Sequence, residues 1–279
     1  MIISDDKIEE LKATANRVRV NAIKMAVNTK GRGAHIGSSL SCVEIVTALY
    51  CGVMNYCNSN HTDEARDRFI CSKTHAVLAT YPILHEIGLI AEEDLLNYRQ
   101  DGSDLFGYPR NTNFGLEFEG GSLGMGLSFG IGQALAARLR NLTYRTFVLL
   151  GDGELNEGSV WEGFMAASQY KLANLTVIID RNNMSLDGDT ESIIALEPLQ
   201  DKLVSFGWHV LRCNGHNFAE LFHTFAKTSD EKPSVVIADT IKGKGVSFME
   251  NRREWHQARI NEEQSKKALA ELAEVRNGH

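Results

Sequence analysis

The sequence has no long apolar run and no concentration of positive charge, and each absence excludes a class of protein. No segment approaches the roughly 20 apolar residues that a membrane-spanning helix needs, so no membrane association is predicted. The formal net charge is -7, and the 29 lysines and arginines are scattered along the 279 residues. Nucleic-acid binding requires a clustered basic surface, so no nucleic-acid partner is predicted.

Cysteine is also sparse. The five cysteines are odd in number and contain no Cys-x-x-Cys pair, so neither a disulfide framework nor a zinc site is indicated. The first ten residues hold four acidic side chains instead of a basic stretch followed by an apolar core, which is not the pattern of an export signal. These observations favour a cytoplasmic location.

What the sequence does contain is an alternation of short apolar segments with segments of helical periodicity. Strands are expected at 68–71, 147–150, 177–180, 208–211 and 235–238. The alternation predicts an α/β fold, with a mostly parallel sheet of five to six strands and helices on both faces. No linker or repeat interrupts it, so we predict one domain at 1–252. A tail at 253–279 follows, with a short surface or partner-facing helix at 262–275.

Local signals place some of the helices. Apolar residues at helical spacing predict a helix over 8–27, which the Gly31-Arg32-Gly33 run ends. Ser41, with Glu44 three residues later, has the pattern of a capping box that would open a second helix through about residue 52. A further helix over 157–172 would connect the second and third strands.

Two polar residues follow directly on neighbouring apolar segments. Asp152, in Gly151-Asp152-Gly153, comes after the second strand, and Asn182 comes after the third. Parallel strands collect ligands at their carboxyl ends, so the two side chains should lie side by side over the N-terminus of the intervening helix. A carboxylate, an amide oxygen and a backbone carbonyl suit Mg²⁺ or Ca²⁺, and the helix N-terminus favours a diphosphate.

Other interpretations of this pattern exist. Gly-Asp-Gly also occurs in ordinary tight turns, and Asp152 has the side chain of a helix N-cap. The glycines at 151 and 153 equally remove the Cβ atoms that would keep a phosphate away from backbone N–H groups. Asn182, placed after a second strand, favours the ligand site.

Several further motifs, in the same order along the chain, resemble the N-terminal half of transketolase from about residue 15 to 256. They are Ala34-His35-Ile36-Gly37, Ser72-Lys73-Thr74-His75, Gly121-Ser122-Leu123-Gly124, Gly151-Asp152-Gly153-Glu154, Asp187-Gly188, Phe206-Gly207-Trp208-His209-Val210, Lys242-Gly243-Lys244-Gly245 and Trp255-His256. The resemblance implies a thiamin diphosphate-binding fold. It also implies that Asp152, Asn182 and the backbone carbonyl of Met184 bind the metal.

By the same resemblance, His35, His75 and His256 surround the reactive carbon of the cofactor, where a group titrating near neutral pH can donate or accept a proton. Tyr108, in Phe106-Gly107-Tyr108-Pro109, stands where transketolases usually have histidine. Tyrosine still donates a hydrogen bond, but with a pKa near 10 it is a poor proton shuttle. The departure puts the usual donor sugar in doubt. Any one of these histidines would more often be structural.

The resemblance assigns the remaining cofactor contacts to two glycine-rich segments and one lysine. Gly121 and Leu123 would lie against the cofactor rings, although glycines there and at 126–132 also permit close helix packing. Gly153, Asn182, His75 and His256 would contact the cofactor too. Lys242 would add positive charge near the diphosphate, although a solvated loop lysine is the commoner role.

Two acidic residues of the predicted helix at 157–172 are candidates for contacts between subunits. Glu157 and Glu162 resemble carboxylates that transketolases place at the subunit interface. Their alternative role is to complement the positive charge at the N-terminal end of that helix.

In the family a second, pyrimidine-binding module completes the site, and nothing in the sequence resembles it. We therefore expect a separate C-terminal subunit that carries this module, assembled with the chain as a heterotetramer or a similar symmetric oligomer. The implied reaction moves a two-carbon ketol unit from a ketose, with a phosphate group expected, to an aldose through thiamin diphosphate.

Three alternatives stay open. The first is a transketolase-like enzyme whose donor is an α-keto acid or a modified sugar, which Tyr108 favours. The second is a non-catalytic paralogue. The third is a dinucleotide-binding dehydrogenase, which the lack of a Gly-x-Gly-x-x-Gly run after an early strand disfavours.

Overall fold

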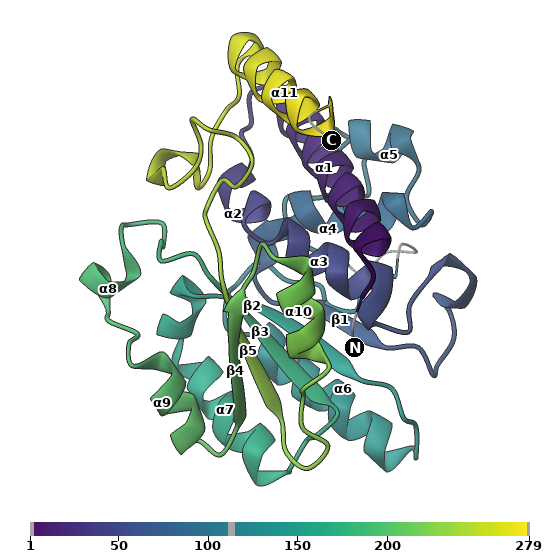
Figure 1. The fold of residues 1–279 in the computed structure, drawn as a ribbon, viewed down its shortest axis with the longest axis vertical. Helices are drawn as coiled ribbons and strands as arrows, with labels where there is room; N and C mark the ends of the chain where they lie inside the picture. The colour runs from purple at the N-terminus through teal and green to yellow at the C-terminus, as the bar shows by residue number, and fades with distance from the viewer. Residues whose placement is uncertain (1–2, 111–114, 278–279) are drawn as a thin grey trace.

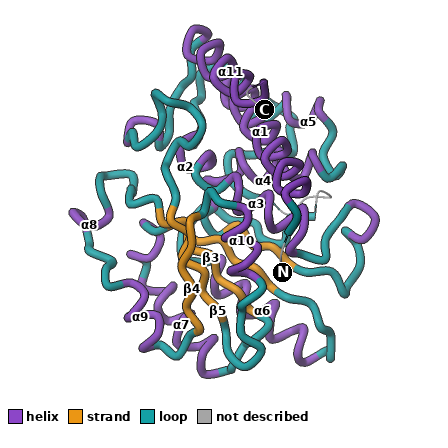
Figure 2. The backbone as a smooth tube through the Cα atoms, viewed as in Figure 1, coloured by secondary structure: helices purple, strands orange, loops and turns teal. Residues whose placement is uncertain are grey.

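Five short strands form one parallel sheet in the computed structural model, which describes residues 3–110 and 115–277 (Figures 1 and 2). The order across the sheet is β1-β2-β3-β5-β4. The strands are β1 Arg68–Cys71, β2 Thr146–Gly151, β3 Leu175–Arg181, β4 His209–Asn214 and β5 Ser234–Asp239. The predicted α/β fold with a parallel sheet is confirmed. Residues 1–2 and 278–279, at the outer ends of the predicted domain and tail, lie outside the described residues.

Helices cover both faces of this sheet. They are α1 Asp5–Val27, α2 Ile36–Leu40, α3 Val43–Ala48, α4 Val77–Glu86, α5 Glu92–Leu96, α6 Gly126–Leu139, α7 Gly158–Gln169, α8 Thr190–Ile193, α9 Leu199–Ser205, α10 Phe218–Phe225 and α11 Glu262–Asn277. A π-helical turn at Leu49–Val53 extends α3. Short 3₁₀ turns lie at Asn58–Asn60, Thr74–Ala76, Gly153–Asn156 and Arg253–Trp255.

Alternate residues of each central strand enter two different cores, which is why these strands are apolar throughout. In β2, Phe147 and Leu149 pack with α1, α3, α4 and α10. Val148 and Leu150 point the other way and pack with α6, α7 and α9. The paired register sets Gly151 opposite Asp180, so the carboxyl ends of β2 and β3 lie next to each other. The predicted pairing of these two strands is confirmed.

Two local expectations were wrong. Ser41 does not cap a helix: Cys42 is the residue before α3, and the Ser41 hydroxyl donates instead to a carboxylate oxygen of Asp180 at 2.6 Å. The same Ser-x-x-Glu spacing is therefore used for long-range contacts. The fourth strand begins one residue later than predicted, because the backbone N–H of Trp208 donates to the carbonyl of Leu203 in α9 at 3.3 Å, and the pairing with β5 starts at His209.

The segment after residue 252 packs back onto the N-terminal helices. An antiparallel bridge joins Ala34 to Ala258. Figure 1 shows α11 lying along α1, and its Ala268 and Leu272 are buried there. The domain boundary at 252 stays a prediction. Within the described part of the chain, no helix has the length and apolar character needed to cross a membrane.

Candidate active site

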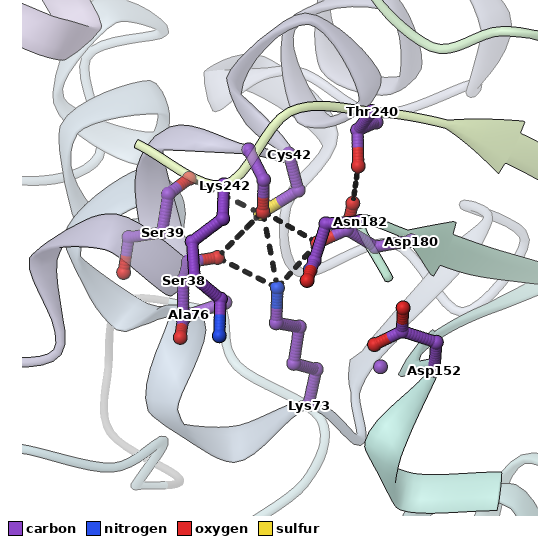
Figure 3. Close-up of polar contacts among 12 residues, drawn as sticks. Ser38, Ser39, Cys42, Lys73, Ala76, Asp152, Asp180, Asn182, Thr240 and Lys242 are labelled. Carbon is purple, nitrogen blue, oxygen red and sulfur yellow. Dashed lines mark hydrogen bonds and ion pairs between the residues drawn. The ribbon is translucent and has the colours of Figure 1, made fainter. Parts of the chain in front are cut away.

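Asp152 and Asn182 lie at the same edge of the sheet, one strand apart (Figure 3). The Asp152 carboxylate accepts hydrogen bonds from the backbone N–H of Gly153 at 2.8 Å and from that of Asn183 at 2.6 Å. It is 1% exposed, and Asn182 is 3% exposed. Burial, reinforced by the neighbouring Asp180 carboxylate, raises the pKa of Asp152. The side chains therefore converge as the strand pattern predicted.

The turn after Asp152 differs from the expectation in one respect. A 3₁₀ turn, Gly153–Asn156, follows Asp152 directly, and α7 begins only at Gly158, with Glu157 at its N-cap. Asp152 thus lies over the 3₁₀ turn and not over the N-terminus of α7. It also caps that turn, so the capping role and a ligand role are both open to the one carboxylate.

Glu154 makes hydrogen bonds that connect this turn to the segments around Ser72 and Gly124, a role that sequence reasoning missed. One oxygen of its buried carboxylate accepts from the Ser72 hydroxyl at 2.5 Å and from the N–H of Gly124 at 2.8 Å. The other accepts from the N–H of Gly151 at 3.0 Å. Gly124 has a φ of +81°, and an added Cβ would lie 2.8 Å from that of Glu157, so the turn requires glycine.

A second missed feature is the buried ion pair of Lys73 and Asp180 between the strand ends (Figure 3). The Lys73 ammonium also donates to the carbonyl of Ser38 at 2.7 Å. Asp180 accepts from Thr240 and from the side-chain amide of Asn182, the latter at 3.2 Å. Because Asp180 accepts from the NH₂ group, the side-chain oxygen of Asn182 points to the other side, where it accepts from the backbone N–H of Met184 at 3.1 Å and keeps one lone pair for a cation.

Lys242 joins three segments of the site. Its ammonium donates to the carbonyls of Met184 at 3.0 Å and Ser185 at 3.3 Å, and it lies 3.1 Å from Nδ1 of His256. The residue is 1% exposed, so the solvated-lysine alternative is wrong. Burial and the positive charge of Lys73 lower the pKa of Lys242 to about 8. A buried cation with so depressed a pKa favours an anionic ligand beside it.

The three imidazoles selected from the sequence form one cluster. The ring centroids of His35, His75 and His256 are 5.4, 5.7 and 5.1 Å apart in pairs. Tyr108 joins them, with its ring 5.9 Å from that of His35. Tyr108 is 44% exposed, whereas Nδ1 of His35 is buried without a hydrogen-bond partner. The cluster therefore opens to solvent beside Tyr108 and leaves one acceptor or donor free.

All three imidazoles are held neutral at physiological pH, so the expectation that they titrate near neutral pH is wrong. Burial, with the positive charge of Arg99, lowers the pKa of His35 to about 4. Burial and the ammonium of Lys242 lower that of His256 to about 3, and the pKa of His75 is lowered well below its usual value mainly by burial. An ammonium has no lone pair, so Nδ1 of His256 accepts from Lys242 and its Nε2 carries the proton.

The glycine-rich segment before α6 lies beside this cluster. The carbonyl of Gly121 accepts from the Thr74 hydroxyl at 3.1 Å, and an added Cβ at Gly121 would lie 3.6 Å from the Tyr108 ring. Leu123 is half-buried in the turn that Glu154 holds. The packing alternative is present as well, because an added Cβ at Gly126 would meet Ser72 at 2.5 Å.

Leu186 is an apolar residue that sequence reasoning missed. It is 60% exposed, in the turn that follows the two carbonyls bound by Lys242. An open apolar side chain at the edge of a polar site offers contact to an apolar part of a ligand. Its signal in the sequence was its place between Met184 and the Asp187-Gly188 pair.

Charged side chains gather around the strand ends. Lys73, Lys242 and Arg181 are the buried cations, and Asp152, Asp180 and Glu154 are the buried acidic groups. Arg181 contacts Asp152 at 3.3 Å and is also paired with Glu191 at 2.6 Å and Glu197 at 3.4 Å, which are more exposed. Burial raises the pKa of Asp152 and of Glu154, so a cation beside either carboxylate would stabilise its charged form. Within the described residues no three His, Cys, Asp or Glu side chains gather as a metal cage.

This fold and site define an α/β domain with buried charged side chains at the carboxyl ends of its central strands, the edge where such sheets bind ligands, and with three neutral imidazoles next to Lys242. Residues 11–273 match the family model described as "Transketolase, thiamine diphosphate binding domain". The chain therefore belongs to the transketolase family, whose enzymes are transferases.

Two relatives, each named as one subunit of a transketolase, are similar over most of their length. The chain is 40% identical over 267 residues to a subunit of the apulose-4-phosphate transketolase of Phocaeicola vulgatus, covering 95% of this chain and 94% of the relative. It is 39% identical over 241 residues to the SqwG subunit of the 6-deoxy-6-sulfo-D-fructose transketolase of Clostridium sp., covering 85% and 88%.

A solved structure gives the same fold. The transketolase from Leishmania mexicana matches with a TM-score of 0.87 and 28% identity, over 98% of this chain and 42% of that chain. The chain thus spans less than half of this transketolase, and nearly all of the relatives that are named as subunits.

Proposed function

We propose that this chain is the N-terminal subunit of a two-chain transketolase that moves a two-carbon ketol unit from a ketose donor to an aldose acceptor. The observation that carries the proposal is that Lys242 connects the cluster of three neutral imidazoles, through His256, to the loop that follows Asn182, through the carbonyl of Met184. The strand ends would hold a metal-bound diphosphate, and the imidazoles would lie beside the reacting carbon.

The strand ends would hold Mg²⁺ or Ca²⁺ through Asp152, Asn182 and the carbonyl of Met184, which already accepts from Lys242 and would use its second lone pair. The burial of Asp152 supports this assignment, because a divalent cation would stabilise the carboxylate that burial disfavours. Further contacts to the cofactor would come from His75, Gly121, Leu123, Gly153, Lys242 and His256. When bound, thiamin diphosphate supplies the carbanion chemistry that breaks and forms the carbon–carbon bond.

The chain's own residues would handle protons and orientation. Nδ1 of His35 has no hydrogen-bond partner in the described part of the chain, so it would donate to or accept from a sugar hydroxyl according to the tautomer of the ring. His256 presents the proton on Nε2, because Lys242 occupies Nδ1. A neutral imidazole donates one hydrogen bond and accepts another, so the three rings would orient the hydroxyls of the donor and acceptor sugars, and any proton transfer through them would need the bound cofactor to raise their pKa values.

The second subunit would supply the pyrimidine-binding module, and the assembly would be a heterotetramer. The naming of two relatives as subunits supports a separate partner. Glu157 and Glu162 remain our candidates for the subunit contact. The five free thiols are consistent with a reducing cytoplasm, where we place the enzyme.

The test is reconstitution. The purified chain is mixed with the purified product of the neighbouring gene that carries the pyrimidine module, and ketol transfer is followed with Mg²⁺ and thiamin diphosphate. We expect transfer from the mixture and none from either protein alone. Transfer by this chain alone would contradict the two-chain proposal. If the mixture fails to bind thiamin diphosphate, the chain is a non-catalytic relative.

A second candidate differs only in the donor. Tyr108 lies at the open side of the imidazole cluster, where a donor sugar would enter. Relatives named for apulose 4-phosphate and for 6-deoxy-6-sulfo-D-fructose support a modified sugar over an α-keto acid. A donor screen on the reconstituted enzyme separates the choices.

A further inference from the structure

A buried network of three charged or polar side chains lies outside the site described above. Glu44 of α3 contacts Arg19 of α1 at 2.5 Å through one carboxylate oxygen. Its other oxygen lies 3.0 Å from Nδ1 of His216, in the turn after β4. The three side chains are only 8 to 12% exposed. We name Glu44, Arg19 and His216 the Glu44 clamp.

Hydrogen-bond directions fix the state of His216. The backbone N–H of Ile241 lies 2.8 Å from its Nε2, and a backbone N–H can only donate. Nε2 is therefore the unprotonated acceptor, and the proton is on Nδ1, which donates to Glu44. Arg19 in turn donates from Nε to the carbonyl of Lys244 at 3.0 Å.

The clamp therefore makes hydrogen bonds to the main chain on both sides of Lys242, at Ile241 and at Lys244. The Glu44 carboxylate orients both Arg19 and His216, each through one of its two oxygens. An added Cβ at Gly245 would lie 2.8 Å from Nε of Arg19, so the contact with this loop is close. None of the three side chains has a recorded contact with the imidazoles, Asp152 or Asn182.

We propose that the Glu44 clamp positions Lys242, so that its ammonium reaches the carbonyl of Met184 and Nδ1 of His256 together. A lysine side chain has four rotatable bonds and by itself selects no single position. Backbone hydrogen bonds already hold this loop at two points, from Gly243 to the carbonyl of Gly37 and from Asn251 to the carbonyl of Lys242, each at 2.9 Å. The clamp adds restraints at 241 and 244, and together these contacts restrict where the ammonium can go. The proposal rests on the proposed function only for the importance of Lys242 to the cofactor; the geometry of the loop does not depend on it.

A purely structural role makes a different prediction. Buried ion pairs often add little net stability compared with apolar packing, and their loss destabilises a protein as a whole. A clamp on the loop has a local effect instead: substitution should open residues 241–245 before the rest of the molecule unfolds.

The first experiment measures the loop in the full chain without cofactor. His216→Leu removes the acceptor of Ile241. Hydrogen exchange by mass spectrometry should be about three- to tenfold faster over 241–245, the effect of one backbone hydrogen bond. Acetylation of Lys242 by acetic anhydride should rise by a similar factor. In His216→Gln the amide oxygen can replace Nε2 as the acceptor, so the exchange rate and the acetylation of Lys242 should both lie close to those of the unsubstituted chain.

The matched control is His85→Leu, because His85, like His216, is mostly buried and makes an imidazole hydrogen bond to the backbone, here to the carbonyl of Ile90 at 2.7 Å. It should leave exchange at 241–245 unchanged. If His216→Leu does not fold, Glu44→Gln tests the same clamp. Unchanged exchange and unchanged acetylation of Lys242 in the folded clamp variants would overturn the proposal.

A second experiment asks whether the clamp acts through Lys242. The affinity for thiamin diphosphate with Mg²⁺ is measured in the reconstituted enzyme for His216→Leu, Lys242→Met and the double variant. We expect the double variant to bind within about threefold of Lys242→Met alone, since the clamp then has nothing to position. Fully additive losses would refute the positioning role. If the unsubstituted enzyme binds no cofactor, the proposed function fails, and exchange and acetylation still decide the clamp.

Discussion

The buried ion pair of Lys73 and Asp180 provides the sharpest stability prediction. Lys73→Met keeps the length and apolar stem of the side chain and removes only the charge. Asp180, which is fully buried, would then be left as an anion with three neutral donors, from Ser41, Thr240 and Asn182. Breaking a buried pair from one side destabilises a protein by about 3–5 kcal/mol. We expect a loss of unfolding free energy in that range at pH 7.5.

Urea unfolding, followed by far-ultraviolet circular dichroism, measures this loss, with the exposed Lys232→Met as the control expected to change stability by less than about 0.5 kcal/mol. Replacing both partners, as Lys73→Met with Asp180→Asn, removes the lone charge. The double variant should therefore recover more than half of the loss.

The loss of unfolding free energy in Lys73→Met should also depend on pH, and it should be larger at neutral than at acidic pH. Burial acts to raise the pKa of Asp180, and Lys73 is the main influence holding it below the usual value. Without Lys73 the pKa of the folded form rises above that of the unfolded chain. The resulting instability is present at neutral pH and shrinks as the pH falls. Stability of Lys73→Met within about 1 kcal/mol of the unsubstituted chain would refute the reasoning.

Three other predictions concern the imidazoles, α6 and the donor. The pKa of His35 is lowered to about 4 by burial, so the free energy of unfolding should fall as the pH drops from 6.5 toward 4. Urea unfolding at pH 7.5 and at pH 4.5 measures this fall, and it should be about 2 kcal/mol smaller in His35→Gln than in the unsubstituted chain. Gly130→Ala would place a Cβ 2.4 Å from Val148 and should destabilise the protein by about 1–3 kcal/mol. Gly132→Ala meets nothing within 4 Å and should stabilise the protein by up to about 1 kcal/mol. Thermal unfolding compares the two variants, and a Gly132→Ala protein less stable than Gly130→Ala would contradict the packing. Tyr108→His should raise kcat/KM for an unmodified ketose phosphate relative to a modified sugar, and an unchanged ratio would remove Tyr108 from donor selection.

The sheet was predictable because its signals are local. Each central strand is a short apolar run, because burial on both faces of the sheet removes the alternation of polar and apolar residues. Asp152 and Asn182 were predictable because each directly follows such a run. The clustering of His35, His75 and His256 was expected only through the family resemblance, since no spacing rule brings these positions together.

The long-range polar contacts were not predictable. Lys73 meets Asp180 and Glu44 meets His216 across large sequence separations, and no local pattern marks such pairs. Ser41 shows the difficulty most clearly: its spacing to Glu44 fits a capping box, but buried partners from other elements take both side chains. Tertiary contacts overrode a helix-start signal whose strength is only about 1 kcal/mol.

The position of the metal tests the central claim most directly. The chain is crystallised together with its partner in the presence of thiamin diphosphate and Mn²⁺, whose anomalous scattering locates the ion. We expect one Mn²⁺ bound to a carboxylate oxygen of Asp152, the side-chain oxygen of Asn182 and the carbonyl of Met184, with diphosphate oxygens completing its coordination. An ion bound elsewhere, or a diphosphate held without any of these three atoms, would contradict the claim.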